Sequence, residues 1–375
     1  MKEKYKILMT ADTLGGVWNY CLELCKALEK YPVEIHLISF GKHVSPTQFK
    51  AVKKLNNLKI YSSDLKLEWM KNPDIKAIKK RIYELCKKIK PDLIHFNNYV
   101  ENEIFEEIPK LTVFHSCVQT WWKAVKKEKA PPQWNKYYQL VEKALNQSDK
   151  IVFPSFAMLE EAKNTYDFKE NTIVISNARE ISLPKKIKKE KIILCTGRIW
   201  DEAKNLKILG AIAKQLSWPV YIAGDHINPN GEEKIVLENV FFLGKLNAEE
   251  IIKWFCKAEI YVNPGFYEPF GLAVLEAAQA NCALLLSQIK SLQEIWGEAA
   301  LYFNPEDKNQ LKNQLLSLIE NSEKRKSYAL KAKNRATLYN NKIFGKKYFE
   351  LYENLLNPTQ TAVERRNEER YFVKN

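Results

Sequence analysis

Short apolar runs rich in β-branched and aromatic residues alternate along this chain with longer amphipathic stretches, and this alternation limits the possible folds most strongly. In the first half of the chain, the short runs lie at 5–11, 33–40, 92–97, 112–116, 150–155 and 172–176. An amphipathic stretch of helical length, such as 17–30, follows the first of them. Strands that alternate with helices form βαβ units, which build a parallel sheet covered by helices on both faces. The first half therefore predicts a doubly wound α/β domain.

The same pattern begins again after a polar, Lys-rich segment with one proline at 180–191, which we interpret as a linker. The later apolar runs lie at 191–197, 218–224, 240–244, 259–265 and 282–287. Because single cores stop growing near ~250–300 residues, a chain of 375 residues is expected to form two domains. We predict two Rossmann-like, doubly wound domains that face each other across a cleft, at 1–180 and 190–340. The last segment, 341–375, is expected to form a helix and a tail that return to the first domain.

Charge and cysteine usage narrow the class of protein. The chain has 59 Lys and Arg against 45 Asp and Glu, a formal charge of +14, which favours phosphates, nucleic acid or an anionic membrane surface as partners. A Lys-rich solvated surface explains the same excess. The seven cysteines are scattered without a C-x-x-C pair, so a reducing, cytoplasmic setting fits better than a disulfide framework or a zinc site. No run approaches the ~18–20 apolar residues of a membrane span, so membrane contact, if any, is expected to be peripheral.

Two basic and aromatic segments are candidates for such peripheral contact. They are IKAIKKRIYELCKKIK at 75–90 and TWWKAVKKEKAPPQWNKYY at 120–138. Lysines mixed with Tyr or Trp are typical of an anionic bilayer surface. A solvated Lys face is the commoner explanation of such a composition.

The most specific stretch is NPGFYEPFGLAVLEAAQANC at 263–282, which places two carboxylates, Glu268 and Glu276, around an apolar helix start. Pro269 suits a first helical turn, Gly271 allows a ligand close to the backbone, and free N–H groups at a helix start attract anions. Carboxylates accept hydrogen bonds from hydroxyls, so a ligand with both sugar and phosphate fits. Alternatively, Glu268 caps the helix and Glu276 is a surface residue.

Two further loops follow predicted strands. In CTGRIWDEAKNL at 195–206, Arg198 and Lys204 can bind one diphosphate, unless they are simply solvated charges. In ADTLGGVWNY at 11–20, Gly15 and Gly16 permit close backbone approach, although a tight turn explains such a pair equally well. His115 ends the run 112–116, where catalytic groups lie in this architecture, although a lone histidine is more often structural.

Two absences exclude other enzyme classes. The sequence has no Asp-x-Asp pair, so an obvious carboxylate clamp for a metal-bound nucleotide is missing. It has neither a G-x-x-x-x-G-K-[ST] nor a G-x-G-x-x-G motif, which argues against a P-loop nucleotidase and a dinucleotide dehydrogenase.

Together, the segments GGVW, HSCVQTWW and GRIWDEAKN and the E-x7-E pair resemble glycosyltransferase family 4, retaining sugar-nucleotide transferases of the GT-B fold. The resemblance implies that Glu276 binds the donor ribose and Glu268 the transferred hexose. It further implies that Arg198 and Lys204 hold the diphosphate, and that backbone amides come from Phe270, Gly271 and Leu272. Gly15 and Gly16 would then lie under the donor, and His115 would line the transfer site. No cofactor or metal is implied, only a nucleoside-diphosphate sugar and a glycan, lipid-linked or small-molecule acceptor.

The chain departs from the family pattern in two places. Ser176, Asn177 and Ala178 stand where a Pro-Asn-Gly turn is frequent, and Glu202 to Asn205 replace a longer Glu-Lys-Gly segment while keeping Lys204. Two alternatives to the transferase remain open. One is an inactive GT-B scaffold that binds anionic lipid or nucleic acid, although RNA-binding aromatic motifs are absent and we expect no nucleic-acid partner. The other is a GT-B phosphorylase, for which no second phosphate site is identifiable.

Overall fold

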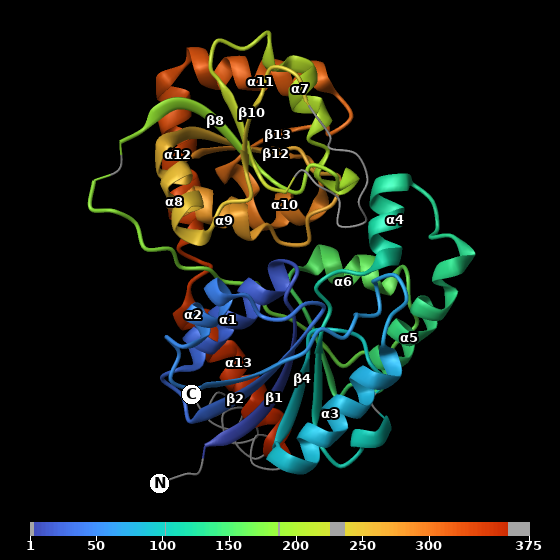
Figure 1. Ribbon diagram of the computed structural model, residues 1–375. Coiled ribbons are helices and arrows are strands. Elements are labelled where there is room, and N and C mark those ends of the chain that lie inside the picture. Colours follow the sequence, from blue (N-terminus) through green and yellow to red (C-terminus); the bar gives the residue numbers. More distant parts are fainter. Residues whose placement is uncertain (1–3, 102, 187, 226–236, 359–375) are drawn as a thin grey trace, which may run out of the picture.

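The computed structural model describes residues 4–358 except 102, 187 and 226–236, and it contains two parallel α/β domains (Figure 1). The N-terminal sheet has seven strands in the order β3-β2-β1-β4-β5-β6-β7. Its strands are β1 (Tyr5–Asp12), β2 (Val33–Phe40), β3 (Leu58–Ser62), β4 (Leu93–Phe96), β5 (Lys110–Val113), β6 (Lys150–Phe153) and β7 (Thr172–Val174). The second sheet has six strands in the order β10-β9-β8-β11-β12-β13. Its strands are β8 (Glu190–Thr196), β9 (Val220–Ala223), β10 (Phe241–Gly244), β11 (Ala258–Asn263), β12 (Ala283–Ser287) and β13 (Leu301–Phe303).

Helices cover both faces of each sheet, as the alternation predicts, because the strands are apolar on both sides. The first domain carries α1 (Gly16–Leu28), α2 (Pro46–Val52), α3 (Ile75–Ile89), α4 (Val118–Lys126), α5 (Asn135–Asn146) and α6 (Phe156–Lys163). The second carries α7 (Lys207–Ala213), α8 (Ala248–Lys257), α9 (Leu272–Gln279), α10 (Lys290–Trp296), α11 (Lys308–Glu320) and α12 (Ser322–Ala336). Short 3₁₀ turns lie at Glu103–Phe105 (η1), Pro132–Trp134 (η2), Glu202–Lys204 (η3) and Gly297–Ala299 (η4). The predicted fold class is confirmed.

The last described helix, α13 (Asn341–Leu356), lies against the first domain rather than the second (Figure 1). It packs against α1, and Phe344, Tyr348 and Tyr352 belong to the same buried cluster as strands of the N-terminal sheet. Gly345 is required there, because a Cβ at this position would lie 2.4 Å from the backbone oxygen of Ala27. The chain therefore passes between the domains twice, through 175–189 and again through 337–340.

Several strand predictions differ from the structure in their boundaries. Strands β3 and β13 were not predicted, since their sequences are short and only partly buried. Strand β5 begins two residues earlier than expected and ends at Val113, so His115 lies in the loop after it. Pro269 lies in a loop, because helix α9 begins only at Leu272.

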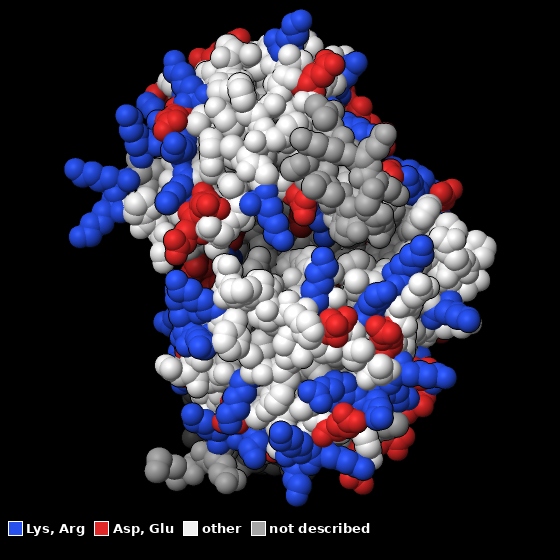
Figure 2. All heavy atoms as spheres, viewed as in Figure 1, with Lys and Arg blue, Asp and Glu red and all other residues white. Residues whose placement is uncertain are grey.

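Basic side chains are scattered over the visible face of both domains, mostly toward its edges and mixed with acidic ones, and a hollow lies between the two domains (Figure 2). Among the described residues, no helix is long and apolar enough to cross a membrane. All seven cysteines are free and buried.

Candidate active site

The loop between β11 and α9 forms one wall of the cleft. Gly271 precedes α9 with a φ of +87°, a conformation that favours glycine, and a Cβ there would lie 3.0 Å from Cγ2 of Val274. No side chain caps the start of α9. The backbone amides at Leu272 and beyond therefore have no side-chain acceptor, while Phe270 is buried beneath them. This arrangement suits an anion at the start of the helix.

Glu268 does not cap α9, so that alternative is wrong. Its Oε2 accepts a hydrogen bond of 2.8 Å from Nζ of Lys204, and the two side chains are 17% and 22% exposed. The backbone N–H of Phe266 also donates to the carbonyl of Ala203 at 2.8 Å. The structure thus brings together the two loops at 195–206 and 263–271 that the sequence predicted separately.

Arg198 lies on the same loop as Lys204 and is more exposed. Its Nη2 lies 2.6 Å from Oδ2 of Asp201, and its guanidinium lies 5.0 Å from the centre of the Trp200 ring. Although burial favours the protonated form of Asp201, Arg198 holds the pKa of that carboxyl below its usual value. Arg198 is 44% exposed, so one side of its guanidinium remains open to a ligand.

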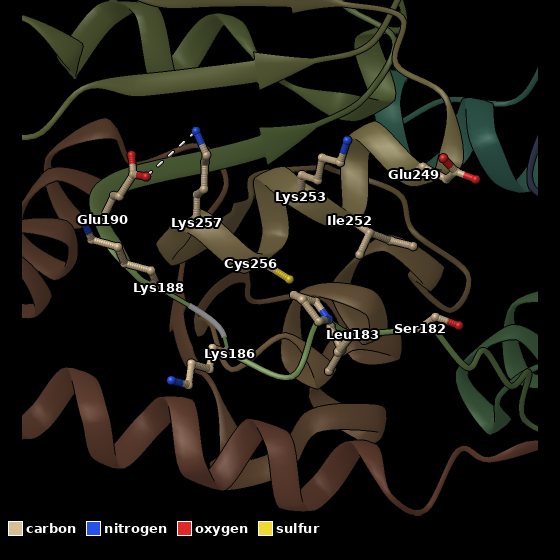
Figure 3. Close-up of a pocket in the computed structure, with 11 residues that line it drawn as sticks. Ser182, Leu183, Lys186, Lys188, Glu190, Glu249, Ile252, Lys253, Cys256 and Lys257 are labelled. Carbon is tan, nitrogen blue, oxygen red and sulfur yellow. Dashed lines mark ion pairs between the residues drawn. The ribbon is translucent and has the colours of Figure 1, made fainter.

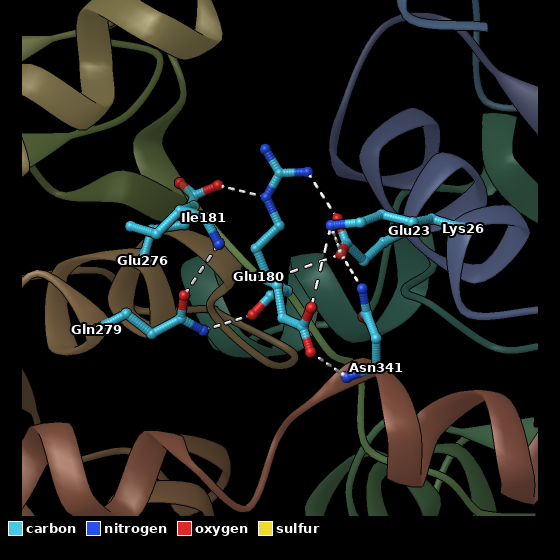
Figure 4. Close-up of polar contacts among 8 residues, drawn as sticks. Glu23, Lys26, Glu180, Ile181, Glu276, Gln279 and Asn341 are labelled. Carbon is cyan, nitrogen blue, oxygen red and sulfur yellow. Dashed lines mark hydrogen bonds and ion pairs between the residues drawn. The ribbon is translucent and has the colours of Figure 1, made fainter. Parts of the chain in front are cut away.

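Glu276 is not a surface residue, which corrects the second alternative. Its side chain is 13% exposed, and its Oε1 accepts a hydrogen bond of 2.7 Å from Nε of Arg179 (Figure 4). Burial raises the pKa of Glu276 above its ordinary value, and Arg179 opposes this rise. Sequence reasoning missed Arg179, because it directly follows the segment that departs from the family pattern and carries no motif of its own.

Gly15 and Gly16 form the start of α1 on the opposite side of the cleft. Both are exposed, neither has a positive φ, and a Cβ on either would meet nothing within 4 Å. Residues 13–14 form a turn just before them, so the tight-turn explanation stays open, while open space lies beside the backbone of both glycines.

His115 is held by the N-terminal sheet. Its Nε2 lies 2.7 Å from Oδ1 of Asn97, and its ring packs edge-on against Tyr20 at 4.5 Å between centroids. Burial lowers the pKa of His115 to about 3, so the ring is neutral at physiological pH. A neutral imidazole can form hydrogen bonds with a ligand but contributes no charge to the site.

Two largely buried carboxyls of the N-terminal domain, Asp12 and Glu68, were not predicted. Asp12 ends β1, and burial raises its pKa to about 6, although the N–H of Leu14 and the charge of Arg198 counteract this rise. Burial likewise raises the pKa of Glu68 to about 7, and its Oε2 has no hydrogen-bond partner among the residues that the structure describes. Asp12 stands three residues before Gly15, a position that could have identified it. Glu68 lies in a loop without a recognisable signal.

Two sets of contacts join the domains. In the first, the Thr120 and Tyr267 hydroxyls lie 2.8 Å apart, and Nζ of Lys126 lies 2.6 Å from Oε2 of Glu202. In the second, the carboxylate of Glu294 accepts hydrogen bonds from the first two backbone N–H groups of α6. These contacts between the domains fix the distance between the two walls of the cleft.

A separate hollow lies outside the cleft, between the linker and α8 (Figure 3). Lys186, Lys188, Lys253 and Lys257 line it around an apolar floor that includes Ile252. None of the residues that line it belongs to the predicted site. Lys253 and Glu249 line this hollow and are therefore suitable control positions for variants of the predicted site.

Two family models match this chain, one in each domain. The sequence profile of glycosyltransferase family 4 matches residues 14–182, and that of the glycosyl transferases group 1 matches residues 190–321. The chain belongs to the family 4 glycosyltransferases. The predicted family and enzyme class are confirmed.

Relatives with curated descriptions match parts of the chain. An uncharacterised 41.2 kDa protein in the cps region of Klebsiella pneumoniae is 28% identical over 198 residues, which cover 48% of this chain and 55% of the relative. The O-antigen chain mannosyltransferase B of Escherichia coli is 32% identical over 79 residues, 21% of each chain. An N-acetylgalactosaminyltransferase of Campylobacter jejuni that acts on a diphospho-undecaprenol substrate is 26% identical, over 45% of this chain and 48% of its own. The chain thus spans about half, or less, of the length of these relatives.

Solved structures match nearly the whole chain. Sucrose-phosphate synthase from Thermosynechococcus elongatus superposes with a TM-score of 0.75 at 17% identity, covering 95% of this chain and all of the other. HepE from Anabaena, solved with UDP and glucose, has a TM-score of 0.72 at 13% identity and covers 93% of this chain and all of its own. These likenesses establish the GT-B fold.

Proposed function

We propose that this glycosyltransferase moves a hexose from a nucleoside-diphosphate sugar to a hydroxyl of a glycan, lipid-linked or small-molecule acceptor, with retention at the anomeric carbon. The observation that carries the proposal is the pairing of Lys204 with Glu268 beside the uncapped start of α9. It combines a cation and free amides for phosphate with a carboxylate for hydroxyls.

The donor would lie with its diphosphate against Lys204, Arg198 and the amides of Gly271 and Leu272. As the glycosidic bond breaks, the nucleoside diphosphate gains negative charge, and fixed cations stabilise that charge most in the transition state. Positive groups of the chain then meet this need, so the proposal includes no metal cofactor. Glu276 would accept hydrogen bonds from the ribose.

The acceptor would approach from the N-terminal domain, past Gly15, Gly16 and His115. Retention is inferred from the family and, without a second close carboxylate, implies attack from the front face. The departing phosphate would then take the proton from the acceptor hydroxyl, and the neutral His115 would position it. Support for the acceptor class comes from the Campylobacter relative, named for a lipid-linked substrate, and from the mannosyltransferase of O-antigen chains. Glycan synthesis in the cytoplasm is the setting we propose.

A thermal-shift panel of UDP-, GDP- and ADP-sugars tests donor binding and selects the nucleotide. A ligand at 100 times its Kd stabilises the native state by ~2.7 kcal/mol, which corresponds to roughly 5–10 °C for domains of this size. Release of nucleoside diphosphate, measured with and without EDTA, then separates the transferase from an inactive binding protein. No shift with any donor, together with no release, would contradict the proposal.

Variants at matched lysines locate the site. Lys204→Ala should weaken donor binding about 10- to 150-fold, since a charged hydrogen bond contributes roughly 1.5–3 kcal/mol. Lys253→Ala, in the outer hollow, should bind the donor as the unaltered chain does. Equal affinities for both variants would place the diphosphate elsewhere.

A further inference from the structure

A polar cluster, which we call the crossover cluster, lies where both connections pass between the domains, with Glu23 buried, Glu276 largely buried, and Lys26 and Glu180 at its exposed edge (Figure 4). It consists of Glu23, Lys26, Arg179, Glu180, Glu276, Gln279 and Asn341. Arg179 and Glu180 belong to the first connection, and Asn341 begins α13 after the second. The N–H of Asn341 donates to Glu180 at 3.0 Å, and its side-chain amide donates to Glu23.

Arg179 occupies the centre of this cluster and bonds carboxylates from both domains. Its Nε donates to Glu276 on α9 at 2.7 Å, and its Nη1 donates to Glu23 on α1 at 3.0 Å. The Arg179 side chain is 18% exposed, and that of Glu23 is 4% exposed. Both bonds come from different nitrogens of one planar guanidinium, so the position of one carboxylate is fixed relative to the other.

The backbone of Arg179 is held to α9 as well. The side-chain amide of Gln279 donates to the carbonyl of Arg179, and the N–H of Ile181 donates to Oε1 of Gln279 at 3.2 Å. Gln279 and Glu276 lie three residues apart and therefore on the same face of the helix. One face of α9 thus holds both ends of this arginine.

The charges in the cluster explain why an arginine is needed. Glu23, Glu180 and Glu276 bring three carboxylates, whereas Arg179 and Lys26 bring two cations. Lys26 lies 3.6 Å from Glu23 and 4.0 Å from Glu180, and the ion pairs of the described residues give Glu276 no cation other than Arg179. A buried carboxylate that loses its cation tends to take up a proton instead.

We propose that Arg179 is a positioning residue for the donor nucleotide: it orients Glu276 and compensates its charge, so that Oε2 of Glu276 accepts hydrogen bonds from the ribose hydroxyls. The inference rests on the proposed function, which assigns the ribose to Glu276. Arg179 itself acts through Glu276. Without it, Glu276 is turned away or protonated, and a protonated carboxyl is a poorer acceptor.

Calorimetric titration with UDP, GDP and ADP and with their 2′-deoxy counterparts tests this role. The ribose diphosphate that binds the unaltered chain should bind about tenfold or more tightly than its deoxy counterpart, as expected for one charged hydrogen bond. In Arg179→Met, this preference should fall below about threefold. Affinity for the ribose nucleotide should also become dependent on pH and recover as the pH rises, because a buried Glu276 without its cation ionises only at higher pH.

Arg81→Met is a matched control, since Arg81 lies on α3 and is 43% exposed. It should leave the ribose preference and its pH profile unchanged. An Arg179→Met chain that folds and keeps both the ribose preference and a flat pH profile would overturn the inference while leaving the proposed function intact. Failure of the unaltered chain to bind any of the nucleotides would overturn both.

Arg179→Lys keeps the test decisive if the methionine variant does not fold. A lysine retains the charge but cannot present two fixed N–H groups to two carboxylates. The ribose preference should therefore fall at least threefold, even though the pH profile stays flat. An unchanged preference in this variant would show that Glu276 does not depend on Arg179 for its position.

Discussion

Replacement of Glu268 by glutamine should lower turnover without weakening the binding of the nucleoside diphosphate. The hexose ring gains positive charge as its bond to phosphate breaks, so a carboxylate beside it stabilises the transition state more than the bound donor. Loss of that charged contact costs roughly 1.5–3 kcal/mol, or about 10- to 150-fold in kcat. In the structure, Glu268 also engages Lys204 at 2.8 Å. Glutamine releases this lysine from a competing carboxylate, and the affinity for UDP, GDP or ADP should stay within about threefold or increase.

The variant should remain folded, although less stable. The Lys204–Glu268 pair is partly buried, so its loss should cost about 1–2 kcal/mol, between the values for exposed and buried ion pairs. For domains of this size, this lowers Tm by about 2–8 °C. Steady-state kinetics well below Tm and calorimetry of nucleotide binding give the two numbers, with Glu249→Gln on α8 as the control. A kcat that is unchanged per folded molecule would refute the role of Glu268 at the hexose.

Three further predictions concern protonation and surfaces. Asn97 donates from Nδ2 to the carbonyl of Thr10, so the amide atom that faces His115 is Oδ1, which accepts from the Nε2–H of the ring. Nitrogen NMR should therefore find His115 as the neutral Nε2–H tautomer, unchanged from pH 5 to 8. Burial raises the pKa of Glu68 from 4.5 to about 7, so its carboxyl holds a proton more tightly in the folded state than in the unfolded state. The free energy of unfolding should therefore fall by about 3 kcal/mol as the pH rises from 4.5 to about 7. Glu68→Gln should remove this loss in urea unfolding at pH 5 and 8, whereas an equal decline in both chains would contradict it. Co-sedimentation with anionic vesicles should occur at low salt and weaken at physiological salt, because the apolar side of α3 packs in the core and mainly charged side chains remain exposed for contact. Absence of binding at either salt would contradict this prediction.

The order of elements was predictable because it depends on burial, which the sequence displays directly. Apolar runs such as 33–40 and 282–287 are strands that are buried on both faces, and their lengths match the structure within about a residue. Strand β3 was missed because its residues are only half-buried and lie at the sheet edge, where little apolar sequence is required. Boundaries near turns, such as the end of β5, depend on hydrogen bonds to neighbours that are distant in sequence.

The meeting of the loops at 195–206 and 263–271 was predictable to a similar extent, since the βα loops of one sheet meet at one edge. Lys204 and Glu268 are 64 residues apart, yet both follow strands, β8 and β11, that are neighbours in the sheet. The bridge from Glu276 through Arg179 to Glu23 was not predictable, because Arg179 belongs to a connection and Glu23 to the other domain. Glu23 lies on α1, 156 residues from Arg179, and no periodicity or motif relates the two positions.

The departure from the family pattern at 176–178 is followed directly by Arg179, which gives this junction a structural role of its own. A Pro-Asn-Gly turn shapes the junction through its backbone, whereas this chain has Ser176, Asn177 and Ala178 there and places a long cation directly after them. That cation reaches Glu276 in one domain and Glu23 in the other. A side-chain bridge thus holds together the connection, α1 and α9. Under the proposed function, a nucleotide whose ribose bonds Glu276 contacts the same carboxylate that Arg179 joins to Glu23 in the other domain, so the donor site and the contact between the domains share one guanidinium.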